Sequence, residues 1–424
     1  MPRWLRWTLA LLLLALSAIA LVAWLNVRGE SALPSNEPAF VATPLQITQG
    51  AYLAKAGNCA ACHTVRGGAA YAGGLGIATP FGTVYASNLT PDVNTGIGAW
   101  TASTFWRALH HGRSADGRLL YPAFPYASYT QVSRADSDAL FAYLRSLPPV
   151  SQPNLPHNLA FPYNSQAALA VWRALFFKPA TFEPEPAKPP EWNRGAYLVR
   201  GLGHCAACHA ERNALGATRS ASALAGGMIP MQHWYAPSLA SPQEAGVADW
   251  DTQQVVDLLQ TGVSARGNTM GPMAEVVYGS TQHLSRADLR AMAVFLQDVA
   301  PAQAEPPSRA PAKPDNTLFT SGKKLYTRHC ADCHGEQGEG APGAYPALAH
   351  NRAVALGTPA NLIQVVLHGG YAPATAGNPR PYGMPPFRQT LEGAEIAAVL
   401  TYIRQAWGHA ASTVTPLDVL QHQQ

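Results

Sequence analysis

The stretch Cys59-Ala60-Ala61-Cys62-His63 occurs twice more in this 424-residue chain, unchanged as Cys205-Ala206-Ala207-Cys208-His209 and with one aspartate as Cys330-Ala331-Asp332-Cys333-His334. The chain contains six cysteines, and all of them belong to these three stretches. A Cys-x-x-Cys-His stretch places two thiols where they can bond the vinyl groups of a haem, and the adjacent histidine can then bind the iron. The pattern therefore predicts three covalently attached c-type haems.

Paired cysteines also bind zinc or form redox-active disulfides. Zinc accepts thiolates in any pairing and does not require a histidine at a constant offset, whereas haem attachment does. The histidine directly follows the second cysteine in all three stretches, which favours haem. The residues predicted to bind haem covalently are Cys59, Cys62, Cys205, Cys208, Cys330 and Cys333, and the predicted iron ligands are His63, His209 and His334.

The N-terminus carries a signal for export or membrane insertion. Arg3 and Arg6 precede an uncharged apolar run from Trp7 to Leu25, about the 20 residues that a membrane-spanning helix needs. Ala18-Ile19-Ala20 resembles a signal-peptidase site, but the apolar run continues beyond it, which favours an uncleaved anchor over a cleaved signal sequence. The arginines place the N-terminus in the cytoplasm. We therefore expect the haem domains on the periplasmic side of a bacterial cytoplasmic membrane.

The three motifs lie in an internal repeat. Each motif follows a short helix that carries a glycine, at Gly50, Gly195 and Gly322, and each repeat ends with a helix that has apolar residues at helical spacing. A small residue on the first helix and an aromatic residue on the last would let the two helices cross closely. In the first two repeats, Ser133 and Ser285 begin a Ser-x-x-Asp signature that predicts a helix N-cap. The apolar residues expected to face the core are Leu140, Tyr143, Leu144 and Leu147, then Leu289, Met292, Phe295 and Leu296, and finally Ile396, Val399, Leu400, Tyr402 and Ile403.

The repeat resembles class I cytochromes c, whose first and last helices cross in this way beside the haem. This resemblance implies an all-α fold of three tandem cytochrome c domains after an N-terminal membrane anchor. We refer to these domains as the first, second and third repeats. The predicted division is 1–30 for the anchor or signal sequence, 40–150 for the first repeat, 151–190 for a proline-rich linker with a short helix at 166–177, 191–300 for the second repeat, 301–314 for a second linker, 315–408 for the third repeat and 409–424 for a C-terminal tail.

The sixth iron ligand decides what each haem can do, because methionine closes the site and raises the reduction potential, whereas an open position suits ligand binding or catalysis. In the third repeat, Met384 is the only methionine after the attachment motif and lies in a proline-rich loop before the last helix. In the second repeat, Met273 occupies the corresponding loop, and Met270 is close enough to compete with it. We predict Met384 and Met273 as sixth ligands, with Met270 as the alternative.

The first repeat breaks this pattern. Its loop reads Tyr-Pro-Ala-Phe-Pro-Tyr over residues 121–126, with Phe124 at the place of the methionine, and no methionine occurs between residues 2 and 227. Phenylalanine cannot bind iron. The sixth ligand of the first haem therefore stays open in the sequence, and an unliganded or water-bound iron is one of the alternatives. The candidate residues are His110, His111, His157, Met228 and Met231.

Three stretches are similar to the three-haem cytochrome c subunits of bacterial membrane-bound dehydrogenases. They are Tyr85–Trp100, the loop at 121–126 and the Gly-Pro-Met-Ala-Glu-Val-Val loop at 271–277. Those subunits partner alcohol, gluconate, sorbitol or aldehyde dehydrogenases. The resemblance implies a separate catalytic subunit with a flavin, pyrroloquinoline quinone or molybdenum cofactor, and an electron path through the haems to ubiquinone or a terminal oxidase. Phe124 departs from the methionine expected in this family.

The sequence offers no substrate-oxidising centre of its own, because no Gly-x-Gly-x-x-Gly stretch follows a predicted strand and no other cofactor signature is present. A net charge of +4 without a basic block gives no support for nucleic-acid binding. We therefore expect a non-catalytic electron-transfer subunit. The alternative is a haem enzyme or small-ligand binder, such as a peroxidase, that acts at an open first haem.

Overall fold

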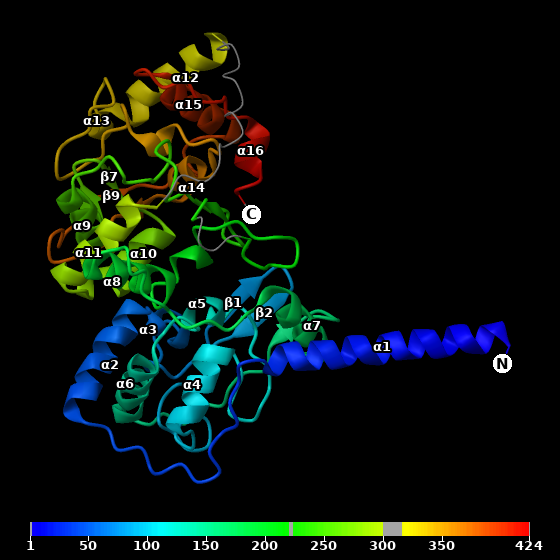
Figure 1. The fold of residues 1–424 in the computed structure, drawn as a ribbon. Coiled ribbons are helices and arrows are strands. Elements are labelled where there is room, and N and C mark those ends of the chain that lie inside the picture. The colour runs from blue at the N-terminus through cyan, green and yellow to red at the C-terminus, as the bar shows by residue number, and fades with distance from the viewer. Residues whose placement is uncertain (1, 220–223, 300–315, 424) are drawn as a thin grey trace. The chain divides into compact units, whose positions relative to one another are not determined.

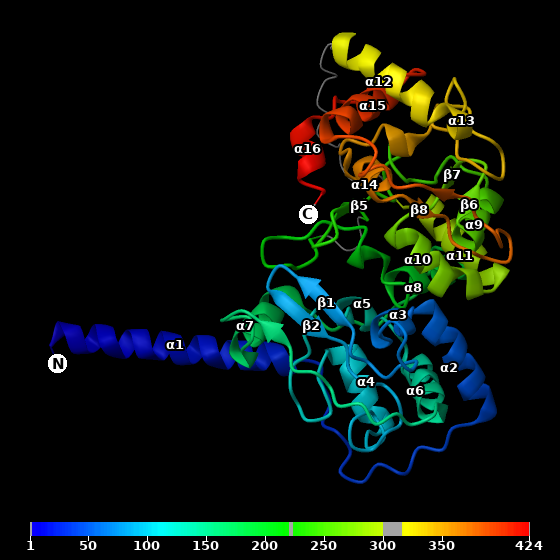
Figure 2. The ribbon, with the colours of Figure 1, turned by 180° about the vertical axis from the view of Figure 1, so that it is seen from behind.

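The computed structural model describes residues 2–219, 224–299 and 316–423, which divide into two compact units (Figures 1 and 2). The first unit holds the residues up to Glu183 together with 214–217, and the second holds Pro184–Asn213 and the residues from Thr218 onward. The first Cys-x-x-Cys-His motif belongs to the first unit, and the other two belong to the second unit. The linker predicted at 301–314 lies outside the described residues.

The first unit begins with a long apolar helix, α1 (Arg3–Val27). Its leucines and alanines are strong helix formers, and its 25 residues span about 37 Å at the usual helical rise. No residue of α1 is buried, and Figure 1 shows it extending away from the rest of its unit. The helix is long and apolar enough to cross a membrane.

The remaining elements of the first unit are helices joined by one small sheet. The helices are α2 (Pro44–Ala56), α3 (Cys59–His63), α4 (Ala102–His111), α5 (Tyr126–Tyr129), α6 (Arg134–Ser146) and α7 (Gln166–Phe176). Strands β1 (Gly76–Thr79), β2 (Gly82–Tyr85) and β3 (Asn158–Leu159) form an antiparallel sheet in the order β1-β2-β3. In its register Ile77 lies opposite Val84, and Thr83 lies opposite Asn158.

The second unit contains two repeats built in the same way. Its helices are α8 (Pro190–Arg200), the short 3-10 helix η1 (Cys205–Ala207), α9 (Thr252–Thr261), α10 (Pro272–Gly279), η2 (Thr281–His283), α11 (Arg286–Gln297), α12 (Asn316–His329), α13 (Ala331–His334), η3 (Arg352–Val354), α14 (Ala360–His368), α15 (Gly393–Gln405) and α16 (Pro416–Leu420). Its strands form three antiparallel pairs, β4 (Gly227–Ile229) with β5 (Trp234–Ala236), β6 (Val263–Ser264) with β7 (Gly267–Asn268) and β8 (Gly370–Tyr371) with β9 (Gly383–Met384).

These strands correct the expectation of a purely helical fold. Helices form the core of every repeat, but short antiparallel ribbons occur in the long connections between them. The connections contain turns that need a positive φ, for example at Gly82 (φ 123°) between β1 and β2. Backbone groups on either side of such a turn face each other and pair. The fold is therefore mainly α with small β-ribbons.

The expected crossing of first and last helices occurs three times, in the pairs α2/α6, α8/α11 and α12/α15. A glycine makes each close approach possible, because a Cβ atom at this position would overlap a backbone carbonyl oxygen of the opposite helix. The overlapped carbonyls belong to Ala139 for Gly50, to Ala291 for Gly195 and to Ala398 for Gly322. The same Cβ would lie 2.7 to 2.9 Å from the Cβ of an aromatic residue, Tyr143, Phe295 or Tyr402. The prediction of a small residue against an aromatic is confirmed.

The last helices carry the core, as their apolar spacing predicts. Leu289 and Ile396 are fully buried, and Leu140 is 3% exposed. Tyr143 and Leu147, at the margin of α6, are only partly buried. The predicted caps are also present, because the hydroxyls of Ser133 and Ser285 each accept the amide of the residue three positions later at 3.1 Å.

Helix α7, at the place expected in the first linker, packs against the end of α1. Asn26 donates to the carbonyl of Ala170 at 2.9 Å, and Arg28 donates to the carbonyl of Phe177 at 2.6 Å. Arg173 donates to the side-chain oxygen of Asn26 at 3.0 Å and is only 3% exposed. The outer face of α7 still exposes apolar side chains, among them Leu175. These contacts hold α7 against the C-terminal end of α1.

Candidate haem-binding sites

The three predicted iron-binding histidines share one backbone contact. Nδ1 of His63 lies 2.7 Å from the carbonyl oxygen of Ser87, and Nδ1 of His209 lies 2.7 Å from that of Pro237. Nδ1 of His334 lies 3.0 Å from the carbonyl oxygen of Pro346. A carbonyl oxygen can only accept, so each Nδ1 carries the proton and each Nε2 keeps its lone pair. This is the tautomer that an iron-binding histidine needs, and the contact fixes the ring orientation.

Burial keeps these imidazoles neutral. Removal from water lowers the pKa of all three histidines, while the hydrogen bonds to Ser87, Pro237 and Pro346 act in the opposite direction and are the smaller effect. A neutral ring with a free Nε2 lone pair is the ligand form of histidine. The three histidines therefore fit haem iron in both charge and tautomer.

The cysteines stand beside these histidines on short helical turns, α3, η1 and α13 with its flanking residues. Burial raises the pKa of Cys59 and Cys205 to about 12 and that of Cys330 to about 11. Such thiols are protonated at neutral pH, unlike the low-pKa thiolates of redox sites. Within the described residues, no group of three or more His, Cys, Asp and Glu side chains is arranged to hold a metal ion.

The loops predicted to carry sixth ligands differ between the repeats. Met384 lies in β9 and packs against the same core cluster as Cys330 and Ala331, so it belongs to the site of the third motif. Met273 is the second residue of α10 and is half-buried. The terminal methyl of Met270 lies 3.3 Å from the position that a Cβ on Gly370 would take, so it points to the third repeat. Both methionine assignments stay predictions, with Met273 favoured over Met270.

Phe124 lies close to the first motif. Its ring centroid is 5.3 Å from that of Tyr129. The hydroxyl of Tyr129 donates to the carbonyl of Gly57 at 3.3 Å, and the neighbouring Cys59 and Cys62 contribute to raising its pKa. A chain of contacts thus joins the loop that carries Phe124 to the turn that carries the cysteines.

The histidine candidates of the first repeat have other roles. His157 accepts the backbone amide of Tyr85 at Nδ1, at 3.1 Å, so its proton is on Nε2, the opposite tautomer to His63. His110 stacks on Trp106 with ring centroids 4.3 Å apart and is hydrogen-bonded to the backbone of Thr130.

His111, the last residue of α4, lies among arginines. Burial lowers its pKa to about 4, and the charges of Arg173, Arg113 and Arg107 act in the same direction. His110 also has its pKa lowered to about 4, by burial and by the charge of His111. Both rings are neutral parts of a packed interior. The two methionine candidates, Met228 and Met231, belong to the second unit and expose 48% and 56% of their surface.

Sequence reasoning did not find the carbonyl partners of the three histidines. Ser87, Pro237 and Pro346 follow their histidines by 24, 28 and 12 residues and contribute backbone atoms only. A weak signal exists, because Tyr85-Ala86-Ser87 and Tyr235-Ala236-Pro237 occupy corresponding places in their repeats.

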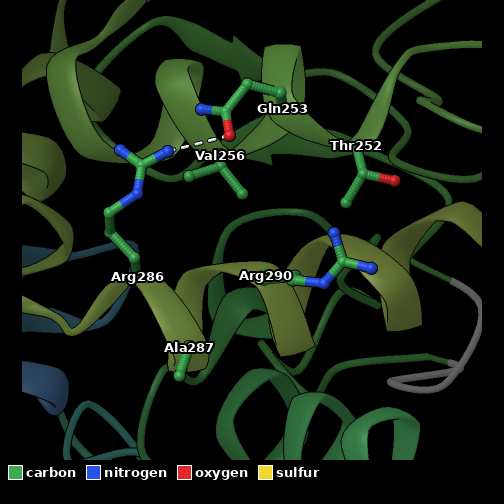
Figure 3. Close-up of a pocket in the computed structure, with 6 residues that line it drawn as sticks. All are labelled: Thr252, Gln253, Val256, Arg286, Ala287 and Arg290. Atoms are coloured by element: carbon green, nitrogen blue, oxygen red, sulfur yellow. Dashed lines mark hydrogen bonds between the residues drawn. The ribbon is translucent and has the colours of Figure 1, made fainter.

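A surface hollow of about 200 Å³ lies between α9 and α11 in the second repeat (Figure 3). Arg286 and Arg290 border it, and Arg286 donates to the side-chain oxygen of Gln253 at 2.8 Å. The hollow contains no residue of a Cys-x-x-Cys-His motif and no predicted sixth ligand. It is separate from the haem sites.

Comparison with known proteins identifies relatives along nearly the whole chain. Residues 47–148 and 319–407 match the cytochrome c family. The cytochrome c subunit of the quinone alcohol dehydrogenase of Komagataeibacter europaeus is 38% identical over 392 residues, which cover 88% of this chain and 83% of that subunit. The gluconate 2-dehydrogenase cytochrome c subunit of Pantoea cypripedii is 37% identical over 391 residues, 88% of each chain. A nicotinate dehydrogenase subunit of Pseudomonas putida is 41% identical over 363 residues, but this chain spans only 30% of its length.

Proposed function

Since this chain belongs to the family of cytochrome c subunits of bacterial dehydrogenases, we propose that it carries three covalent haems and passes electrons from a catalytic subunit to ubiquinone or a terminal oxidase. Haem c supplies reversible one-electron transfer. The proposal of three haems is supported by the contact from histidine Nδ1 to a backbone carbonyl, which recurs at His63, His209 and His334. The second motif has this geometry although it lies outside the two segments that match the cytochrome c family.

The role of the protein is to hold each haem and to orient the histidine that binds its iron. In each repeat the two cysteines fix the porphyrin edge, and the histidine presents Nε2 while its Nδ1 is held by the backbone. Met273 and Met384 close the second and third sites, which favours electron transfer over ligand binding and raises the reduction potential. The crossed helices keep each site rigid. These roles require no acid, base or nucleophile from the chain, so the oxidation of substrate is assigned to the partner.

Direct contacts hold the second and third repeats together within the second unit. The side-chain amide of Asn361 accepts the backbone amide of Tyr235 and donates to its carbonyl, both at 2.8 Å. Arg352 pairs with Asp249 at 2.7 Å. The first contact lies two residues from Pro237, which orients His209. These contacts support the proposal that the second and third haem sites keep a constant separation.

The first unit supports membrane attachment. Helix α1 is apolar and unburied, and its last turn is tied to α7 through Asn26 and Arg28. We propose that α1 anchors the chain in the cytoplasmic membrane and that the haem domains lie in the periplasm, as Arg3 and Arg6 at the N-terminal end of α1 indicate. The relatives named above are subunits of dehydrogenases, which supports a catalytic dehydrogenase as the partner. We propose that this partner carries a flavin, pyrroloquinoline quinone or molybdenum cofactor.

A haem count combined with electron transfer tests this proposal. The full-length protein, extracted in detergent with its co-purifying subunit, is expected to contain three haems per chain by the pyridine haemochrome assay. Replacement of both cysteines of one motif by alanine should remove one third of the haem. Addition of the partner's substrate should reduce the haems, and a soluble ubiquinone analogue should reoxidise them. Two haems per chain, or haems that stay oxidised with a fully active partner, would contradict the proposal.

A further inference from the structure

The first repeat places a side chain without a donor atom where the other repeats place methionine. Phe124 lies between Ala123 and Pro125 in a loop that leads into α5, and Met384 lies before Pro385 in the corresponding loop of the third repeat. A benzyl group cannot coordinate iron. The remaining candidates for the sixth ligand in the first unit are its histidines, His110, His111 and His157.

The geometry argues against His157 and His110. In His157, Nδ1 is already used as an acceptor for the amide of Tyr85, so the neutral ring has no lone pair left on Nε2. The ring of His110 is buried and stacks on Trp106, and its Nδ1 has no hydrogen-bond partner among the described residues. Iron binding by His110 would break the stacking on Trp106.

His111 is also committed elsewhere. It is 6% exposed, and the nearest charges are those of Arg173, Arg113 and Arg107, with Arg113 bonded to Glu30 at 2.9 Å. This cluster lies at the C-terminal end of α1, where Arg173 is bonded to Asn26, and the Arg173 guanidinium also stands 5.2 Å over the ring of Tyr126. A move of His111 to a haem would leave buried arginines without their neighbour.

The contacts of Phe124 place it near the first Cys-x-x-Cys-His motif. Its ring packs 5.3 Å from Tyr129, which is bonded to Gly57 just before the cysteines of the first motif. The other close ring is that of Tyr126, at 6.5 Å. The loop around Phe124 also contains Pro122 and Pro125, so the surroundings of its side chain are mainly apolar and the backbone there is stiff.

We propose that the iron bound by His63 has no protein sixth ligand and that Phe124 covers a small apolar site which accepts a neutral diatomic ligand such as carbon monoxide. The proposal rests on the attachment of haem to Cys59 and Cys62. An apolar surrounding favours an uncharged ligand over an anion, since a charge would lose its hydration without gaining a partner.

The test uses the detergent-extracted, full-length protein with its partner. Electron paramagnetic resonance of the oxidised protein is expected to show one high-spin haem and two low-spin haems. After reduction with dithionite, titration with carbon monoxide should reach one molecule per chain. A haem count on the same sample separates the two proposals, because three haems that are all low-spin and inert to carbon monoxide would overturn this inference and leave the proposed function intact.

Variants at position 124 test whether Phe124 is the residue that leaves the iron without a sixth ligand. Phe124→Met is expected to turn the high-spin haem low-spin, to abolish carbon monoxide binding and to increase the near-infrared methionine band by half. Phe124→Leu, the matched control without a donor atom, should still bind one carbon monoxide per chain. Met384→Ala should raise the number bound from one to two, which checks the assay on a site closed by methionine. If Phe124→Met kept the high-spin signal while Phe124→Leu lost it, the placement of Phe124 opposite His63 would be wrong.

Discussion

The crossing of α12 and α15 gives a prediction whose size follows from the structure. Gly322→Ala adds a methyl group that would overlap the carbonyl oxygen of Ala398 and lie 2.9 Å from Cβ of Tyr402. Carbon atoms in contact normally stand about 3.5 to 4.0 Å apart, so the helices would have to separate by roughly an ångström. The obstacle on the α15 side is backbone, which cannot change rotamer to make room.

Two opposing effects set the change in the free energy of unfolding that Gly322→Ala causes. Alanine is favoured over glycine inside a helix by about 1 kcal/mol, whereas overpacking of a tight contact costs about 1 to 3 kcal/mol. Because separation of the helices also loosens the contacts of Tyr326 and Tyr402, we expect the upper end of that cost and a net destabilisation of about 2 kcal/mol. For a domain of this size, this corresponds to a fall of about 10 °C in the melting temperature.

The matched control is Gly393→Ala at the first position of α15. There the nearest atoms to an added Cβ are 3.8 Å away, at ordinary contact distance, on Val419. Thermal unfolding of the full-length protein, followed by the loss of the methionine band in the near infrared, should show an early transition for about half of that band in Gly322→Ala and no shift in Gly393→Ala. Equal melting of the two variants would refute the argument that backbone overlap sets the need for glycine.

Three further outcomes are expected. Met273→Leu should remove about half of the near-infrared methionine band and Met270→Leu should leave it unchanged; the reverse result would make Met270 the ligand. Asn361→Ala removes two hydrogen bonds to the second repeat and should make the residues around the junction, Tyr235 and Asn361, exchange their backbone hydrogens faster in the full-length protein, while unchanged exchange would mean that the junction does not depend on this residue. The pKa of His110 and of His111 is lowered to about 4, so these rings stay neutral in the folded protein while the unfolded chain takes up protons below its ordinary value of 6.5. The urea midpoint should therefore fall as the pH drops from 6.5 towards 4, and a double variant with glutamine at both positions should show a smaller fall; an equal fall would place the pH dependence elsewhere.

The sequence predicted the helices and helix caps whose signals lie within a few neighbouring residues. The apolar spacing of the last helices and the caps at Ser133 and Ser285 depend on neighbours within a few turns, and both are present. The glycine before each motif contacts a distant helix, and its recurrence in all three repeats made that contact predictable. The short ribbons were not predicted, because β1 and β2 have only four residues each and their pairing depends on the turn between them.

Contacts that do not recur between the repeats, and that use backbone atoms of a distant segment, could not be predicted from the sequence. The pairing of Asn361 with Tyr235 joins residues 126 positions apart and uses backbone atoms on one side, so no pattern of residue types reveals it. The same holds for the role of His157, whose tautomer depends on a backbone amide 72 positions away. The ligand roles of Met273 and Met384 remain predictions that spectroscopy has to test.

The backbone origin of the histidine contact limits how these sites can diverge. A carbonyl oxygen is present whatever side chain follows it, and this chain itself uses serine at 87 and proline at 237 and 346 for the same contact. A point substitution at these positions therefore keeps the hydrogen bond to the histidine Nδ1. The ability of the histidine Nε2 to donate electrons to an iron then stays largely unchanged. Variation among the three centres then has to arise on the opposite face, where, on our proposal, one substitution between methionine and phenylalanine separates an electron carrier from a site for ligands.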